Sequence, residues 1–169
     1  MNSSSAKQTF LRIWDREFRT TTNVFRSFPE EAVDVKPHER SRPACDLVWQ
    51  CVIDERAIAA IAEQPVHDLR STPPPPPVPK TMHEIAFAYE AAHREAAAKV
   101  DSLTAGEFGR NVTSILKGGE WTMPQPDAFW GNLMDEVHHR GQLTLYLRFA
   151  GGKVPSIYGP SADQPVPTW

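Results

Sequence analysis

A run of five consecutive prolines, Pro73 to Pro77, is the feature that most restricts the fold of this 169-residue chain. Proline has no backbone N–H and its ring fixes φ, so such a run forms polyproline II rather than a helix or a paired strand. The run lies within residues 65–80, which we expect to form a stiff surface connector. Docking of the prolines onto a partner with an aromatic-lined groove is the alternative.

Four segments outside the connector have the apolar spacing that is typical of amphipathic helices. They span residues 6–28, 43–64, 81–103 and about 125–150. Thr81 followed by Glu84 predicts a capping box at the start of the third helix, and Gly151-Gly152 predicts the end of the fourth. The one β-like run is residues 111–117.

Four long helices with short connections predict an all-α protein, a four-helix bundle that forms a single domain over residues 1–169. The proline-rich crossover joins its second and third helices. A C-terminal tail with no helical spacing follows, and we expect it to pack on the bundle through Ile157, Tyr158 and Trp169.

The composition excludes several classes of partner. Apolar residues make up 40% of the chain, charged residues 23%, and the net charge is −3. There is no basic tract and no zinc-finger or RNA-binding motif, so we expect no nucleic-acid partner. No apolar run approaches the ~18 residues of a membrane span, and the first residues lack the apolar core of a signal peptide. We therefore expect a cytoplasmic protein that does not insert into a membrane.

The densest group of chemistry-bearing residues lies in the fourth predicted helix, where residues 135–142 read Asp-Glu-Val-His-His-Arg-Gly-Gln. Asp135 and His139 are four residues apart and share one face of the helix, from which both can reach one divalent cation. Much of the surrounding segment is apolar, and polar groups on an inward face need partners. A ligand-lined pocket is therefore our hypothesis.

The last fifty residues carry a set of short motifs: His138 to Leu143, Tyr146 to Arg148, Gly151-Gly152, Val154-Pro155 and Ile157 to Asp163. These motifs resemble the DinB/YfiT-like superfamily of small four-helix proteins. This resemblance implies an up-down-down-up bundle, frequent homodimers, and a divalent metal held by three histidines, one on the second helix and a His-x-x-x-His pair on the fourth. It also implies chemistry with low-molecular-weight thiols.

This chain departs from the implied ligand set at two of the three positions. His139 matches the last histidine, but Asp135 and Gln50 stand where the other two are usual. We predict Gln50, Asp135 and His139 as the metal ligands, with His138 and Asp54 as further candidates. Oxygen-rich sites lean towards Mn, Mg or Ca and away from thiophilic zinc, and the divalent metals retained as cofactor candidates are Mn, Ni and Zn.

The alternative to a metal centre is a degenerate site, in which His139 hydrogen-bonds Asp135 or Gln142 inside the bundle. Two functions therefore remain open. One is an enzyme in which a metal lowers the pKa of water or a thiol, for hydrolysis or thiol transfer on a small molecule. The other is a non-catalytic dimeric protein that binds a small molecule or acts in a stress response.

We expect a homodimer under both functions, because the first helix carries more aromatic surface than one face of a small bundle must bury. Its aromatic residues are Phe10, Trp14, Phe18 and Phe25.

Other notable side chains have structural interpretations. We expect His38, His67, His83 and His93 in solvent, Cys51 as a packed thiol, and Arg140 and Arg148 in ion pairs with Glu136 or Asp163.

Overall fold

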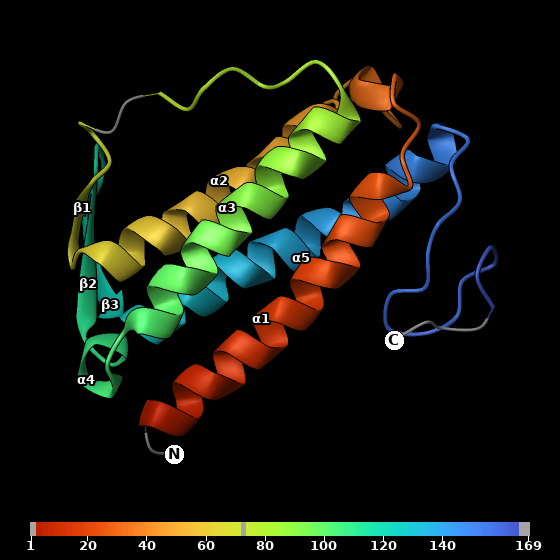
Figure 1. The fold of residues 1–169 in the computed structure, drawn as a ribbon. Helices are drawn as coiled ribbons and strands as arrows, with labels where there is room; N and C mark the ends of the chain where they lie inside the picture. The colour runs from red at the N-terminus through yellow and green to blue at the C-terminus, as the bar shows by residue number, and fades with distance from the viewer. Residues whose placement is uncertain (1–2, 72–73, 166–169) are drawn as a thin grey trace.

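The computed structural model describes residues 3–71 and 74–165, and four long helices form most of it (Figure 1). Helix α1 runs upward in this view, α2 and α3 run downward, and α5 returns upward. Helices α2 and α3 pack against each other, α5 packs against α1 and α2, and α1 also packs against α3. The bounds are Ser3–Arg26 for α1, Ala44–Glu63 for α2, Met82–Ser102 for α3 and Gln125–Phe149 for α5.

These bounds lie within three residues of those predicted from apolar spacing. The capping box at the start of α3 is confirmed, since the Thr81 side chain accepts from the Glu84 backbone N–H and the Glu84 side chain accepts from the Thr81 N–H. Two short helices, η1 (Ala32–Asp34) and α4 (Ala105–Phe108), lie in the connections.

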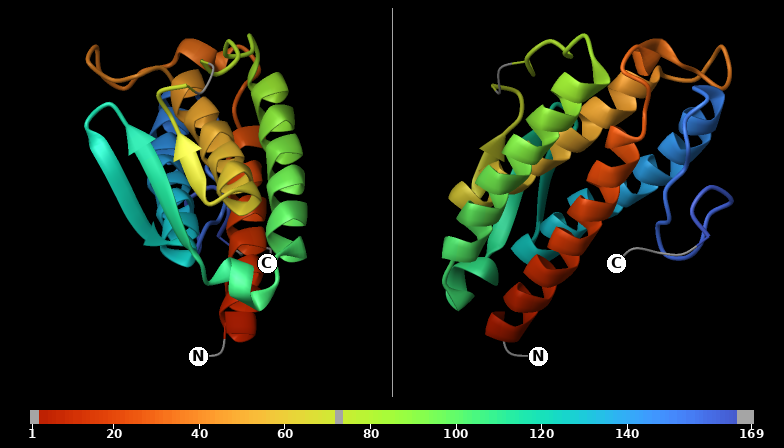
Figure 2. Two further views of the ribbon diagram at one scale, coloured as in Figure 1. Left: turned by 90° about the vertical axis from the view of Figure 1, so that its left-hand side faces the viewer. Right: turned by 45° about the vertical axis from the view of Figure 1, so that its right-hand side comes forward.

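The prediction of an all-α protein is wrong, because a three-stranded sheet stands at one end of the helices (Figure 2). Strands β2 (Asn111–Leu116) and β3 (Gly119–Pro124) form an antiparallel hairpin that turns at Lys117 and Gly118. Gly119, the first residue of β3, has a φ of 138°. Strand β1 (Val66–Asp68) pairs in parallel with β2, so the first part of the predicted connector is a paired strand. Sequence spacing cannot reveal a three-residue strand whose partner lies more than forty residues away.

Arg110 ties this sheet to the helices. Its guanidinium donates to the carbonyls of Ile61 and Ala62 near the end of α2 and to Oε1 of the buried Gln125 at the start of α5. The hairpin therefore bridges the ends of two long helices.

The single chain buries the aromatic residues of α1 that we expected to be left for a dimer contact. Phe10, Trp14 and Phe25 are at most 1% exposed within this single chain, and Phe18 stacks on His93 of α3. The reason that we gave for a homodimer is therefore wrong, because the chain covers these rings itself.

The C-terminal tail packs on α1 and α5. The Tyr158 hydroxyl contacts Glu17 and Arg140, and Arg148 of α5 pairs with Asp163 as predicted. Trp169, the third expected anchor, lies outside the described residues.

Candidate functional site

The predicted ligands lie on two helices that pack together, α2 and α5. On α2, Gln50 Nε2 donates to Asp54 Oδ1 over 3.0 Å. On α5, His139 Nε2 lies 3.4 Å from Asp135 Oδ2. The two pairs meet where the carboxyl groups of Asp54 and Asp135 hydrogen-bond each other. We call these four residues the α2–α5 seam.

Asp54 is the electrostatic centre of the seam. The pKa of its carboxyl is raised to about 7: burial is the main cause, the hydrogen bond from Gln50 lowers the pKa, and the negative charge of Asp135 adds to the rise. Asp54 Oδ2 is buried and accepts no hydrogen bond from an N–H or hydroxyl group. A second carboxylate beside it means that one of the two must hold a proton or meet a cation.

His139 is partly engaged elsewhere. Its Nδ1 lies 3.1 Å from Gln142 Oε1, and the Gln142 amide nitrogen lies 3.1 Å from His138 Nε2. Of the two hydrogen bonds that we proposed for a degenerate site, the one to Gln142 is present but exposed, and Asp135 lies at ion-pair distance. Across residues 3–71 and 74–165, no three His, Cys, Asp or Glu side chains are grouped closely enough to hold a metal.

The chemistry of the seam's donors suits a divalent cation, although its His and Asp side chains are not grouped closely enough in this structure to hold one. Two carboxylates, one imidazole nitrogen and one amide oxygen are ordinary ligands for Mn, Ni or Zn. Asp54 Oδ2, a buried oxygen without a donor, is the specific observation that favours a cation there. The role of Gln50, Asp135 and His139 as ligands remains a prediction.

A second polar network, which the sequence analysis missed, lies deeper between the helices. Glu55 Oε1 accepts from Trp14 Nε1 over 3.0 Å and lies 2.8 Å from His93 Nδ1. Glu136 Oε2 accepts from the Tyr89 hydroxyl over 2.7 Å. The carboxyl groups of Glu55 and Glu136 hydrogen-bond each other. We call these five residues the inner network.

The two glutamates of the inner network have raised pKa values. Burial raises the pKa of both well above the ordinary value, the charge of Asp54 raises both further, and the charge of Glu55 also raises that of Glu136. Glu55 Oε2 and Glu136 Oε1 find no N–H or hydroxyl donor, and a proton on one of the two carboxyl groups is the donor available to them. The sequence does hold a signal, since both glutamates lie at helical spacing from buried apolar residues.

Two histidines that we expected in solvent are buried. His93 was expected in solvent because Arg94 follows it, yet it is buried against Phe18 and Trp14 and bonded to Glu55. His67 was expected in a solvated loop, yet it is buried on β1.

Arg140 also differs from its predicted pairing. Its guanidinium donates to Glu17 Oε2 over 2.8 Å and to the Thr21 hydroxyl over 3.2 Å, both on α1, rather than to Glu136. The Tyr158 hydroxyl donates to the same Glu17 oxygen over 2.6 Å. This cluster fastens α5 and the tail to α1. Cys51 is a buried thiol that donates to the Leu47 carbonyl, as expected for a packed cysteine.

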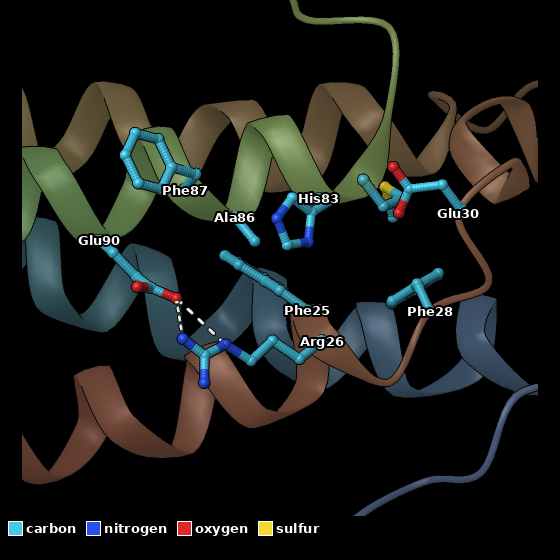
Figure 3. A pocket seen from close by; sticks show the side chains of 9 residues that line it. Phe25, Arg26, Phe28, Glu30, His83, Ala86, Phe87 and Glu90 are labelled. Atoms are coloured by element: carbon cyan, nitrogen blue, oxygen red, sulfur yellow. Dashed lines mark hydrogen bonds and ion pairs between the residues drawn. The ribbon is translucent and has the colours of Figure 1, made fainter.

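A surface hollow of about 220 Å³ opens between the end of α1 and the start of α3 (Figure 3). Phe25, Phe28 and Ala86 form its apolar wall, and Arg26 donates twice to one oxygen of Glu90 at its rim. None of the predicted ligands lines it, so it is separate from the seam.

These features define a class of protein: four long helices in a mostly helical fold, a small sheet at one end, and a polar seam between α2 and α5. The model of the DinB family matches residues 1–166, and the chain therefore belongs to the DinB family, as the sequence resemblance predicted.

Individual proteins resemble this chain in sequence or in fold. The protein YrdA of Bacillus subtilis (strain 168) is 25% identical over 155 residues, which cover 92% of this chain and 89% of YrdA. A DinB-like protein of Bacillus cereus ATCC 10987 has the same fold, with a TM-score of 0.74, 20% identity, and coverage of 89% of this chain and 97% of that one. The DinB-like protein YjoA of B. subtilis gives a TM-score of 0.70 at 15% identity, over 89% of this chain and 96% of its own.

Within the described residues, no helix combines the length and the apolar character that crossing a membrane requires.

Proposed function

We propose that this DinB-family protein binds one divalent cation at the α2–α5 seam and acts there on a small molecule by hydrolysis or thiol transfer. Asp54, Asp135 and His139 are the proposed ligands, and Gln50 is a fourth if its amide turns its oxygen towards the seam. The observation that carries the proposal is Asp54 Oδ2, a buried carboxyl oxygen without a donor, beside the second carboxylate of Asp135.

A cation at this seam would supply Lewis acidity, which lowers the pKa of a bound water or thiol. Asp54, with a pKa of about 7 in the cation-free chain, would release its proton when it binds the cation. Asp135 is nearly half exposed, so the seam is open to solvent and to a small substrate.

The second candidate is a non-catalytic small-molecule-binding protein with a degenerate metal site. The hydrogen bonds that already engage Gln50 with Asp54 and His139 with Gln142 favour it. Under this function the seam needs no cation, because a proton on Asp54, whose pKa is raised to about 7, removes one of its negative charges.

Calorimetric titration of the metal-stripped protein with Mn²⁺, Ni²⁺ and Zn²⁺ separates the two candidates. We expect one saturable site that Asp135→Ala removes and that Asp127→Ala, a change at an exposed acid elsewhere on α5, leaves intact. A chelator should lower the thermal stability of the loaded parent, because a cation that binds only the folded state stabilises it.

A double variant, Gln50→His with Asp135→His, tests whether the positions converge. Three imidazoles on one site should raise the affinity for Ni²⁺ and Zn²⁺ above that of the parent. If the parent binds no metal and the double variant does, the seam has the geometry of a metal site but the native chain is the degenerate protein. If neither binds, the proposed cation site is wrong.

We also propose that the four long helices act as one bundle that pairs with a second copy through the outer face of α5. Met134, Leu145 and Phe149 on this face are each more than 60% exposed and recur at helical spacing. In an antiparallel pairing centred near residue 140, Met134 lies opposite Leu145, and Phe149 lies opposite Gly131, beside which there is open space. Closed two-fold dimers of this kind bury the same patch on both copies.

Light scattering tests the dimer. We expect twice the monomer mass for the parent and the monomer mass for Leu145→Glu. The matched control is Leu69→Glu, which places the same charge on an exposed leucine in the connector. A monomeric parent at micromolar concentration would refute the proposal.

A further inference from the structure

A second groove, separate from the seam, lies between α1 and α3. Its volume is about 410 Å³, and Leu11, Trp14 and Ala97 form much of its apolar lining. His93 lines the groove and also belongs to the inner network. The groove therefore joins solvent to the polar interior of the molecule.

The orientation of the His93 ring is fixed from three sides. Phe18 stacks on one face of the ring with a centroid distance of 3.8 Å and an angle of 4°. Trp14 meets the ring edge-on at 4.6 Å. Glu55 Oε1 holds Nδ1 at 2.8 Å. The side chain is 7% exposed, so its position is set by packing and by one hydrogen bond.

The same contacts select the tautomer of His93. Trp14 Nε1–H can only donate, so Glu55 Oε1 already acts as an acceptor. We assign His93 Nδ1 as a second donor to that oxygen, an assignment that puts the proton on Nδ1 and a lone pair on Nε2. Burial lowers the pKa of His93 to about 4, a shift that keeps the ring neutral.

Nε2 is then a free acceptor at the floor of the groove. In the described part of the chain it has no hydrogen-bond partner, and it is not among the buried polar atoms that lack one. It therefore contacts the solvent of the groove. A nearly buried side chain with one unpartnered nitrogen in a cavity is typical of a binding site.

The rim of the groove carries two acids, Asp15 and Asp101. Two nearby cations are engaged with other groups. Arg19 pairs with Asp15 in an exposed i,i+4 contact, which contributes little, and Lys7 donates to the carbonyls of Asp101 and Leu103. Arg94 acts on His93 as a further positive charge. The lining itself thus combines apolar walls, a lone pair and two carboxylates.

From this combination we infer that the α1–α3 groove binds a small organic ammonium ion, whose N–H donates to His93 Nε2 and whose alkyl part lies against Leu11 and Ala97. Asp15 and Asp101 complement its charge. An alcohol offers the donor without the charge, and a carboxylate offers neither. The site is distinct from the α2–α5 seam and needs no metal.

The test is a titration of ¹⁵N-labelled protein, in buffer with a chelator, with butylammonium, butanol and butyrate, followed by NMR. We expect butylammonium to shift the His93 Nε2 resonance saturably, butanol to bind several-fold more weakly, and butyrate to leave the resonance unchanged. The free protein should show a proton on Nδ1 and none on Nε2.

Two pairs of variants locate the site. Ala97→Leu fills the groove without changing a charge and should weaken binding by about tenfold or more, whereas Ala60→Leu, at a half-buried alanine of α2, should not. Asp101→Asn should weaken butylammonium binding and leave butanol unaffected, whereas Asp127→Asn should change neither.

Three results would overturn the inference. They are an unshifted His93 resonance at millimolar butylammonium, equal binding by the parent and Ala97→Leu, and equal binding of butanol and butylammonium. The chelator keeps the seam free of metal, so each of these results leaves the proposed cation site untouched.

Discussion

Glu55 of α2 and Glu136 of α5 hydrogen-bond each other through their carboxyl groups in the interior, where neither residue is more than 1% exposed. Two carboxylates in this position repel each other unless one keeps a proton. The contact between α2 and α5 therefore depends on a proton that the unfolded chain would lose near its ordinary glutamate pKa of 4.5.

The first prediction concerns pH. Because the folded pKa of both glutamates is raised, the folded state holds more protons than the unfolded chain above pH 4.5, and unfolding releases them. Stability should fall as pH rises above about 5 towards the raised pKa values of the folded state, by up to ~1.4 kcal/mol per unit of pKa difference. Glu136→Gln should flatten this profile in urea unfolding, because the amide donates to Glu55 without a proton to lose. As a control, Glu120→Gln at an exposed site should keep the parental dependence of unfolding free energy on pH. If Glu136→Gln showed the same pH dependence as the parent, a proton held between Glu55 and Glu136 would be contradicted.

The second prediction concerns the pH dependence of cation binding at the seam. A cation must displace the proton that Asp54 holds below its pKa of about 7. The affinity should therefore increase with pH up to about 7, by up to ~10-fold per unit, and level off above that value. Calorimetry in buffers of different ionisation enthalpy measures the released proton. Asp54→Asn should bind more weakly and release none, and a pH-independent affinity of the parent would refute the assignment.

The third prediction concerns the anchor of the C-terminal tail. Tyr158→Phe removes a hydroxyl that contacts Glu17 and Arg140 and leaves a buried carboxylate short of one donor. We expect a loss of about 1–3 kcal/mol in the free energy of unfolding. Thr144→Val provides a control, since the Thr144 hydroxyl contacts only the Gly141 carbonyl of its own helix. Equal losses for the two variants would show that the tail contact contributes nothing specific.

The fourth prediction concerns the glycine at the end of α5. A Cβ on Gly152 would lie 2.9 Å from the backbone oxygen of Ser27 and would also collide with Leu147. Gly152→Ala should therefore destabilise the protein by about 1–3 kcal/mol. Gly106→Ala, at a position with no atom within 4 Å of the added Cβ, should not. Thermal unfolding of both variants measures the difference, and similar melting temperatures would show that the tail moves aside.

The sequence predicts the structural features that depend on residues close together in the chain. The four helix positions, the capping box at Thr81 and the family follow from residues that are close together in the chain. Asp135 and His139 share a helix face for the same reason.

The sequence predictions are wrong where burial or strand pairing depends on segments that are far apart in the chain. His93 looks exposed beside Arg94, but its burial depends on Phe18, seventy-five residues earlier. The aromatic residues of α1 look like a surplus until α3 and α5 cover them. Strand β1 exists only because β2 lies beside it. The inner network was missed because Glu55 and Glu136 look like surface residues until their helices meet.

The proline-rich crossing divides the molecule into two nearly equal halves. Residues 74–80 carry no helix or strand, and the residues on either side contain two long helices each. Because α2 packs on both α3 and α5, most of the stabilising surface lies between the halves rather than within them. A chain cut in this segment would behave as two complementary fragments. Its folding would then become a bimolecular association whose midpoint depends on protein concentration.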